Sequence, residues 1–265
     1  MKIKIQEKIS RLLFTLLVMA VILFQFTFLS KASTELSNTL ICWGLKRVQN
    51  HEQPVLDVAS VEILNKFKGI SMGNAEKPYI YLTFDLGYEA GYTAQILDVL
   101  KENKVSATFF ITGHYLNTQE ALVKRMIEEG HIVGNHTVNH KALVNLSDEE
   151  IKKEIMTLHT ALYEKFNYEM TYFRPPKGEF SERVLSVTTN LNYKSALWSL
   201  AYDDWDEKKQ GREGYGKSKV LDNLHNGAVI LLHATSKDNA NILDSVIKES
   251  QNLGYTFKSL DDFEW

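Results

Sequence analysis

The chain has 265 residues, a length that suits one large domain or two small ones and that single α/β barrels often reach. Its formal net charge is -3, and lysine and arginine form no block beyond the extreme N-terminus, so no nucleic-acid partner is expected. The single cysteine, Cys42, excludes an internal disulfide framework. Because Ile41 stands where a lipid-attachment signal needs a small residue, we expect Cys42 to be an inert thiol.

The first 32 residues have the pattern of a targeting segment. Basic residues precede residues 12–29, which carry no charge, and a Ser-Lys-Ala sequence follows at residues 30–32. The uncharged stretch is long for a signal peptide and barely long enough to span a bilayer, so residues 1–32 are either a signal peptide or a membrane anchor. Basic residues before such a segment place the rest of the chain outside the cytoplasm, either secreted or membrane-anchored.

Residues 33–78 have mixed polarity and contain scattered prolines and glycines, and we interpret them as a linker and an arm on the following domain, residues 79–265. In that domain, strands are predicted at residues 79–84, 107–111, 132–134, 172–173, 195–198, 228–232 and 256–258. Helices are predicted at residues 93–103, 118–129, 147–166, 181–191, 219–224 and 239–253. Ser147 and Glu150 have the spacing of a capping box.

The alternation of strands and helices implies a mostly parallel sheet with helical crossovers. About seven such units favour a closed or nearly closed barrel, although an open sheet satisfies the same pattern. The expected fold class is therefore α/β, a (β/α) barrel of about seven strands.

Five polar residues follow predicted strands: Asp85, His136, Arg174, Asp204 and His233. The carboxyl ends of parallel barrel strands meet at one face, where active sites are built. We therefore expect these five side chains to gather at one end of the barrel.

His136 and His140 stand four residues apart directly after a predicted strand. If the segment turns helical there, both imidazoles lie on one face and can share a metal ion. Many pairs with this spacing are surface accidents or satisfied core histidines, so the partners elsewhere in the chain decide between these interpretations.

The five residues suit hydrolysis of an amide, which needs a polarised carbonyl, an activated water and a protonated leaving group. Asp85 is the candidate base, although a strand-end aspartate is also a common turn former. His233 is the candidate general acid, and its structural alternative is a satisfied core histidine.

Arg174 could hold Asp85 ionised and oriented, or form a purely structural ion pair at the barrel mouth. The two prolines that follow it stiffen its loop, and Pro176 is expected to contact the substrate. Asp204 could raise the pKa of a neighbouring imidazole or pair with Arg174. Trp205 would supply an apolar wall or a sugar-stacking face, although a core tryptophan is equally common.

The sequences TFDLG, HTVNH, RPPKG, DDW and LLH resemble, in this order, the five motifs of polysaccharide deacetylases of carbohydrate esterase family 4, the NodB-homology group. The resemblance covers about residues 79–260. Longer stretches, such as EEGHIVGNHTVNH and NGAVILLHATSKDNA, are similar to the branch of delta-lactam-biosynthetic de-N-acetylases, which act on spore cortex peptidoglycan. Residues 43–54 also resemble the N-terminal arm of that branch.

The resemblance implies a distorted (β/α) barrel and a monomer that removes the acetyl group from N-acetylmuramic acid whose peptide has been cleaved off. The free amine then closes onto the lactyl carboxyl to give muramic delta-lactam. It implies Asp85 as base, His136 and His140 as ligands of a divalent metal, expected to be zinc, His233 as acid, and Arg174 with Asp204 as orienting residues. A role in sporulation and a place in the cell envelope are implied in the same way.

One position departs from the wider family, which has a second aspartate as third metal ligand where this chain has Leu86. Glu89 is a candidate substitute. The departure is itself a trait of the delta-lactam branch, so it does not imply inactivation.

Two alternatives remain open: a deacetylase of N-acetylglucosamine in peptidoglycan or chitin-like chains, and a catalytically silent, membrane-tethered glycan-binding protein. A serine or cysteine hydrolase is disfavoured. The one G-x-S-x-G sequence, at residues 69–73, lies in the predicted linker and arm, and the single cysteine also lies outside the barrel.

Overall fold

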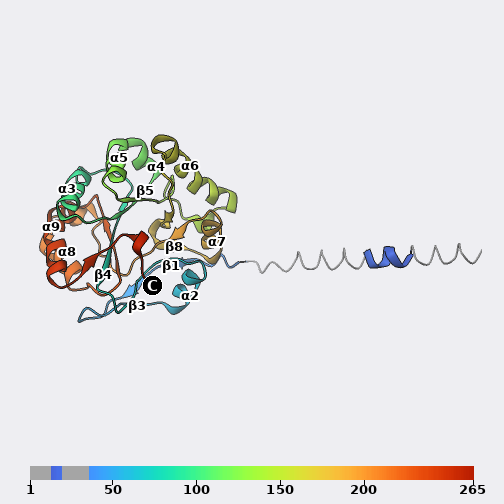
Figure 1. The fold of residues 1–265 in the computed structure, drawn as a ribbon, viewed down its shortest axis with the longest axis horizontal. Helices are drawn as coiled ribbons and strands as arrows, with labels where there is room; N and C mark the ends of the chain where they lie inside the picture. Colours follow the sequence, from blue (N-terminus) through green and yellow to red (C-terminus); the bar gives the residue numbers. More distant parts are fainter. Residues whose placement is uncertain (1–12, 20–35) are drawn as a thin grey trace, which may run out of the picture. The chain divides into compact units, whose positions relative to one another are not determined.

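A computed structural model of the chain describes residues 13–19 and 36–265 (Figure 1). The chain divides into two units, Met1–Ser37 and Asn38–Trp265. In the first unit, residues 13–19 are helical. Within the described residues, no helix is long and apolar enough to cross a membrane. Most of the expected targeting segment, at residues 1–12 and 20–32, lies outside the described part of the chain.

In the second unit, seven strands of the described chain form one sheet in which every pair is parallel. The order is β10-β4-β5-β6-β7-β9, and β11 also pairs with β4. The strands are β4 (Tyr79–Leu86), β5 (Thr108–Ile111), β6 (Ile132–Asn135), β7 (Tyr172–Phe173), β9 (Lys194–Ser195), β10 (Ala228–His233) and β11 (Thr256–Phe257). Each corresponds to a predicted strand.

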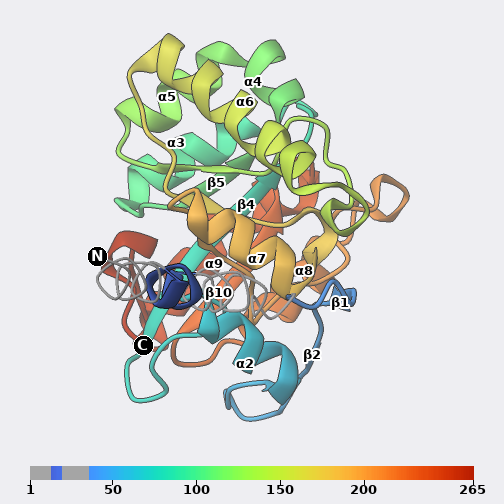
Figure 2. The same cartoon turned by 90° about the vertical axis from the view of Figure 1, so that its right-hand side faces the viewer.

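The sheet curls into a barrel that is only partly closed. The segment that follows β9 makes two isolated bridges, one from Leu200 to Ile230 of β10 and one from Ala196 to Ile70, which lies before β4. Helices surround the sheet in Figure 1, and Figure 2 shows β4 crossing the domain. The α/β class and the distorted barrel of about seven strands are confirmed.

The helices of this unit are α2 (Val58–Lys66), α3 (Thr93–Asn103), α4 (Gly113–Thr118), α5 (Glu120–Glu128), α6 (Asp148–Phe166), α7 (Glu182–Asn190), α8 (Glu213–Leu221) and α9 (Lys237–Asn252). The capping box before α6 is confirmed, because Ser147 and Glu150 exchange side-chain and backbone hydrogen bonds.

Two helix predictions were incomplete. The helix predicted at residues 118–129 is α5, and a separate short helix, α4, precedes it because the Thr112 side chain accepts a hydrogen bond from the backbone of Tyr115. Helix α8 begins six residues earlier than predicted, at Glu213 rather than residue 219. Its early turns contain Gly216, where a Cβ would come within 2.6 Å of the Tyr202 hydroxyl. Close packing against Tyr202 therefore favours glycine at position 216, although glycine has a low helix propensity.

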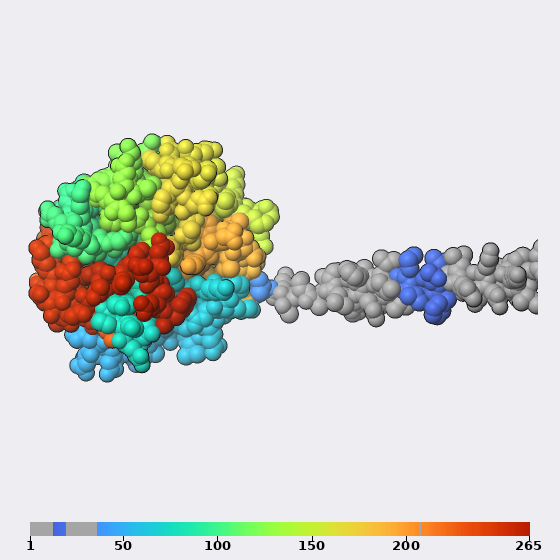
Figure 3. Space-filling model, viewed as in Figure 1, coloured from blue at the N-terminus to red at the C-terminus, as the bar shows by residue number. Residues whose placement is uncertain are grey.

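Residues 38–78 pack on the barrel as part of the same compact unit. They contain β1 (Ile41–Cys42), which pairs with β8 (Glu179–Phe180), and the hairpin of β2 (Leu45–Lys46) with β3 (Val55–Leu56). Trp43 and Leu64 of this arm belong to the main hydrophobic core. Figure 3 shows the arm, coloured blue to cyan, on the surface of the domain beside the C-terminal residues in red.

Candidate active site

The register of the parallel sheet gathers the predicted residues at one end of the barrel. Asp85 lies in β4 directly beside His233 at the end of β10. His136 and Arg174 follow the neighbouring strands β6 and β7, whose last residues, Asn135 and Phe173, are paired. The expected convergence of strand ends is therefore present.

A buried ion pair joins Asp85 and Arg174. Nη1 of Arg174 donates to Oδ1 of Asp85 over 2.8 Å, and both side chains are almost inaccessible. Burial opposes the charged carboxylate, but the charge of Arg174, the neighbouring His136 and His233, and the Arg174 hydrogen bond together outweigh it and hold the pKa of Asp85 below its ordinary value. Asp85 is therefore ionised at neutral pH and can accept a proton.

The Arg174 side chain is held on every side. Its Nε donates to the carbonyl of Ala196 over 2.9 Å, and its Nη2 donates to the carbonyl of Leu197 over 3.3 Å. The guanidinium also lies 4.1 Å from the centre of the Phe110 ring. These contacts fix the direction in which Arg174 presents its charge to Asp85.

His136 and His140 face each other with their Nε2 atoms 3.2 Å apart. The Nδ1 atom of His136 donates to the carbonyl of Arg174 over 2.8 Å, so the lone pair of this ring lies on Nε2, which faces His140. Burial lowers the pKa of His136 to about 4, and burial also lowers the pKa of His140. Both rings are therefore neutral at physiological pH, as metal ligands must be.

The helical condition for a shared metal ion is not met, because residues 136–140 form a loop in which Thr137 (φ 67°) and His140 (φ 54°) are left-handed. The loop is held by Glu154 of α6, whose carboxylate accepts from the backbone and side-chain amides of Asn139 over 2.9 and 2.8 Å. The carbonyl of Glu154 also accepts from the amide of Val138 over 3.0 Å. Tertiary contacts, and not helical periodicity, bring the two imidazoles together.

The Nε2 atoms of His136 and His140 fit a divalent cation that takes only part of its ligands from the protein. Two imidazole ligands of one tetrahedral zinc ion have nitrogens roughly 3.4 Å apart, close to the 3.2 Å between these two atoms. Among the described residues, however, no group of three or more histidine, cysteine, aspartate or glutamate side chains could hold a metal ion. Water or substrate oxygens would complete the shell.

Neither Leu86 nor the candidate substitute Glu89 supplies a third metal ligand. The Leu86 side chain is fully buried in the main hydrophobic core. The suggestion of Glu89 is wrong, because its carboxylate accepts hydrogen bonds from the backbone of Gly91, from Thr93 at the start of α3 and from the Tyr115 hydroxyl. Glu89 therefore stabilises the turn before α3.

Asp204 pairs with His233. Of the two roles considered for Asp204, the structure therefore shows the one beside an imidazole. Nδ1 of His233 lies 2.8 Å from Oδ1 of Asp204, and the other carboxylate oxygen accepts from the backbone of His233 and from Asn239, both over 2.6 Å. Burial opposes the charged ring, but the charge and hydrogen bond of Asp204 outweigh it and raise the pKa of His233. The ring is a quarter exposed, so its Nε2 can reach a bound substrate.

A cavity of about 1110 Å³ opens over these groups. Asp85, His136, His140, Trp205 and His233 line it, and Trp205 is 60% exposed. Pro176 is buried and is not one of the lining residues, whereas its neighbours Lys177 and Gly178 are.

Sequence reasoning missed several residues of this cavity. They are Tyr88, Thr112, His114, Asn139, Lys177, Trp198 and Tyr202. Most lie in loops, where a lone lysine or tyrosine carries no sequence signal. The available hint was that Lys177 lies within the RPPKG motif and Asn139 within the HTVNH motif.

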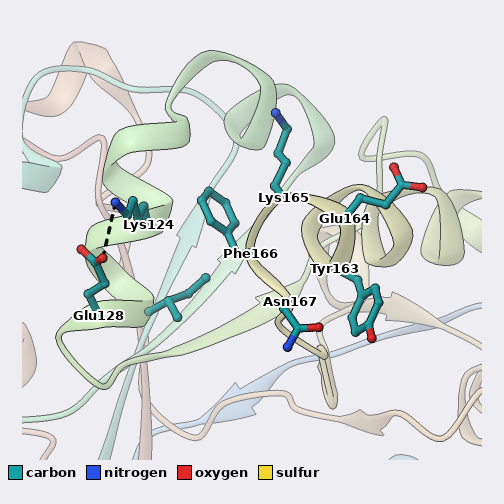
Figure 4. A pocket seen from close by; sticks show the side chains of 8 residues that line it. Lys124, Glu128, Tyr163, Glu164, Lys165, Phe166 and Asn167 are labelled. Atoms are coloured by element: carbon teal, nitrogen blue, oxygen red, sulfur yellow. Dashed lines mark ion pairs between the residues drawn. The ribbon is translucent and has the colours of Figure 1, made fainter.

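A second depression of about 580 Å³ contains none of the predicted residues. It lies between the ends of α5 and α6, and Figure 4 shows Lys124 and Glu128 on one side facing Phe166 and Asn167 on the other. The buried titratable groups lie in the larger cavity, which we therefore take as the candidate active site.

The fold and the site define a hydrolase that works at the mouth of a parallel barrel, and comparison with known proteins agrees. The polysaccharide deacetylase family model matches residues 72–196. The chain is 42% identical to the peptidoglycan-N-acetylmuramic acid deacetylase PdaA of Bacillus subtilis, over 85% of this chain and 86% of that protein. The solved structure of that protein, a family 4 carbohydrate esterase, has a TM-score of 0.83 and covers 86% of this chain and 97% of its own.

A peptidoglycan-N-acetylglucosamine deacetylase of Bacillus cereus is 34% identical, over 71% of this chain and 89% of its own length. These similarities show that the chain belongs to the polysaccharide deacetylase family, carbohydrate esterase family 4. It is a deacetylase of that hydrolase family.

Proposed function

We propose that this protein removes the acetyl group from N-acetylmuramic acid in peptidoglycan strands whose peptide has been cleaved off. The observation that carries the proposal is the meeting of a buried, ionised Asp85 and an Asp204-supported His233 at one cavity. The similarity to a deacetylase of the same sugar supports the choice of substrate.

In this proposal, Asp85 removes a proton from the attacking water, and the water oxygen bonds to the acetyl carbon. The carbon–nitrogen bond then breaks as His233 gives a proton to the leaving amine, so acetate and a free amino sugar form. Asp204 keeps the His233 ring oriented and raises its pKa, so the ring holds the proton that it donates. Arg174 keeps Asp85 ionised and directed toward the cavity.

His136 and His140 are the residues that would hold a divalent metal, with zinc as the expected ion. When bound, such an ion polarises the acetyl carbonyl and lowers the pKa of water. Trp205 would provide a face on which a sugar ring stacks.

Lys177 suits a substrate that carries a carboxylate. Among the described residues that line the cavity, Lys177 is the one lysine or arginine. Burial is the main cause of the lowered pKa of His140, and the charge of Lys177 lowers it further. N-acetylmuramic acid without its peptide has a free lactyl carboxylate, which an ammonium group binds. N-acetylglucosamine has no such group, so Lys177 favours the muramic acid assignment. The deacetylated product carries an amine and a carboxyl group on one sugar, as closure to the muramic delta-lactam requires.

A peptidoglycan substrate places the catalytic unit outside the cytoplasm, in the cell or spore envelope. We propose that residues 1–32 direct it there as a signal peptide or membrane anchor, that residues 33–78 serve as linker and arm, and that residues 79–265 carry the reaction as a monomer. The spore cortex is the proposed site of action.

Acetate release by the full-length protein tests the proposal. The substrates are peptide-stripped glycan strands, intact peptidoglycan and chitooligosaccharides, each with and without added zinc or another divalent metal. We expect release from the stripped strands, with stimulation by metal. Equal or faster release from chitooligosaccharides would instead favour an N-acetylglucosamine deacetylase. Binding of strands without acetate release under any metal would favour a glycan-binding protein.

A further inference from the structure

The N-terminal arm reaches the candidate active site from outside the barrel. Its segment at residues 41–47, which we call the arm segment, lies before residues 72–196, where the family model matches. It contacts two edges of the cavity, one at Gly178, next to Lys177, and the other at Trp198 and Ala201.

The contact with the first edge is a short piece of sheet. Strand β1 of the arm pairs antiparallel with β8, which follows Gly178 directly. The amide of Trp43 then donates to the carbonyl of Gly178 over 3.0 Å. A Cβ at Gly178 would come within 3.1 Å of Trp43 and 2.8 Å of Trp198, so the three residues are packed closely together. The arm thus fixes the backbone beside Lys177.

The contact with the second edge uses two arm side chains. Nε1 of the buried Trp43 donates to the carbonyl of Trp198 over 2.8 Å. Nη2 of Arg47 donates to the carbonyl of Ala201 over 2.6 Å. These carbonyls belong to the chain that leads from β9 to Asp204 and Trp205. The arm segment therefore ties down the start of the loop that carries both residues.

We propose that the arm segment is part of the substrate-binding machinery, with Trp43 as a positioning residue that links the two edges of the cavity. One residue, Trp43, bonds to both edges and so fixes their separation. That separation sets how the sugar ring fits between Lys177 on one side and Trp198 and Trp205 on the other. The role rests on the proposed function, because it concerns the binding of the same glycan strands.

Three variants of the full-length protein test this inference. Trp43→Phe keeps an aromatic ring against Phe180 but removes the donor to the Trp198 carbonyl. Arg47→Ala removes the donor to Ala201 from an exposed side chain, where loss of folding is not expected. The control is Gln53→Ala, because Gln53 joins the arm to the carbonyls of Gly73 and Asn226, which do not line the cavity.

Each of the first two variants loses one hydrogen bond that positions a cavity edge, so each should raise KM for stripped strands about 2- to 10-fold. Their kcat should stay within about twofold of the parent, since the groups that transfer protons are untouched. Gln53→Ala should leave KM unchanged. Thermal unfolding of each variant shows whether it is folded at the assay temperature.

An unchanged KM in both Trp43→Phe and Arg47→Ala, or an equal rise in Gln53→Ala, would overturn the positioning role. The dissociation constant for stripped strands, measured by calorimetry, gives a second readout. If the parent protein releases no acetate, the proposed function fails. The arm segment is then still tested by whether the first two variants weaken binding of the strands.

Discussion

Arg174 shows how one residue serves both stability and function. Its guanidinium is fully buried, and it is bonded to Asp85 and to the carbonyls of Ala196 and Leu197. A buried charge is tolerated only when its partners are in place, so the ion pair and the orientation of Asp85 depend on each other. The structural and functional interpretations of Arg174 therefore describe the same contacts.

Replacing Asp85 by asparagine tests its role as base. We expect Asp85→Asn to lower acetate release by roughly 10²- to 10⁴-fold, the usual contribution of general-base catalysis. It should also destabilise the fold by a few kcal/mol, because Arg174 keeps its charge without a counterion. Acetate release is measured beside circular dichroism and urea unfolding of the same sample. Retained activity in the folded variant would exclude Asp85 as base.

The pairing of His233 with Asp204 predicts a change in the pH profile. A general acid must be protonated, so activity is lost as pH rises through the pKa of His233, and Asp204 raises that pKa. Asp204→Asn removes this charge. Burial, which lowers the pKa of His233, still acts in the variant, and so do the charges of Asp85 and Arg174. The alkaline limb of kcat/KM should therefore move to lower pH. A limb that stays in place would assign the titration to another group.

At the scale of elements, the loop between β6 and α6 departs most from the sequence-based expectation. Left-handed residues such as Thr137 and His140 are unfavourable unless surrounding contacts impose them. Local bonds from Thr137 to Asn135 and from His140 to Thr137 contribute, and the tertiary contacts come from Glu154, fifteen residues beyond Asn139 and in another element. Local sequence rules do not include such a partner, so the two imidazoles were predicted but the backbone that presents them was not.

Glu154 should therefore control metal binding without contacting the metal site. In Glu154→Gln, an amide group replaces one acceptor of the Asn139 hydrogen bonds, and the loop with His140 loosens. Loss of such supporting contacts typically weakens metal binding 10- to 100-fold. Zinc affinity measured by calorimetry is the readout. Glu150→Gln, on the same helix but in its capping box, is the control and should leave zinc affinity unchanged.

The junction between α5 and β6 predicts a second pH effect, on stability. His131 is buried there, and its Nε2 has no hydrogen-bond partner among the described residues. Burial lowers its pKa to about 4, below the roughly 6.5 of an unfolded chain. The unfolded state therefore binds more protons between these values, so stability falls as pH drops from about 6.5 to 4.

His131→Phe should remove this contribution. The free energy of unfolding should then depend less steeply on pH between pH 6.5 and 4. The variant also loses the hydrogen bond from the Ala107 amide, which changes stability at neutral pH but not this slope. Urea unfolding at several pH values measures this slope. The buried His136 contributes to the slope in the parent and in the variant alike, so part of it should remain. An unchanged slope would show that His131 does not titrate with folding.

At the scale of the whole molecule, the order of strands and helices could be predicted because each element carries its own periodicity. The convergence of Asp85, His136, Arg174 and His233 followed from the parallel sheet alone. Lys177 and the arm contacts of Trp43 could not be predicted. The arm contacts join residues more than a hundred positions apart, which leave no local pattern in the chain, and a lone loop lysine carries no periodicity that marks it as a cavity residue.

The position of β4 in the sheet has a consequence for how the protein folds. This first barrel strand lies beside β10 and also pairs with β11, the last strand of the chain. Contacts of such long sequence separation form late and slow the folding of the whole domain. Asp85 meets His233 only when the final third of the polypeptide is present. A nascent or truncated chain therefore has no assembled hydrolytic centre, and activity begins with completion of the domain.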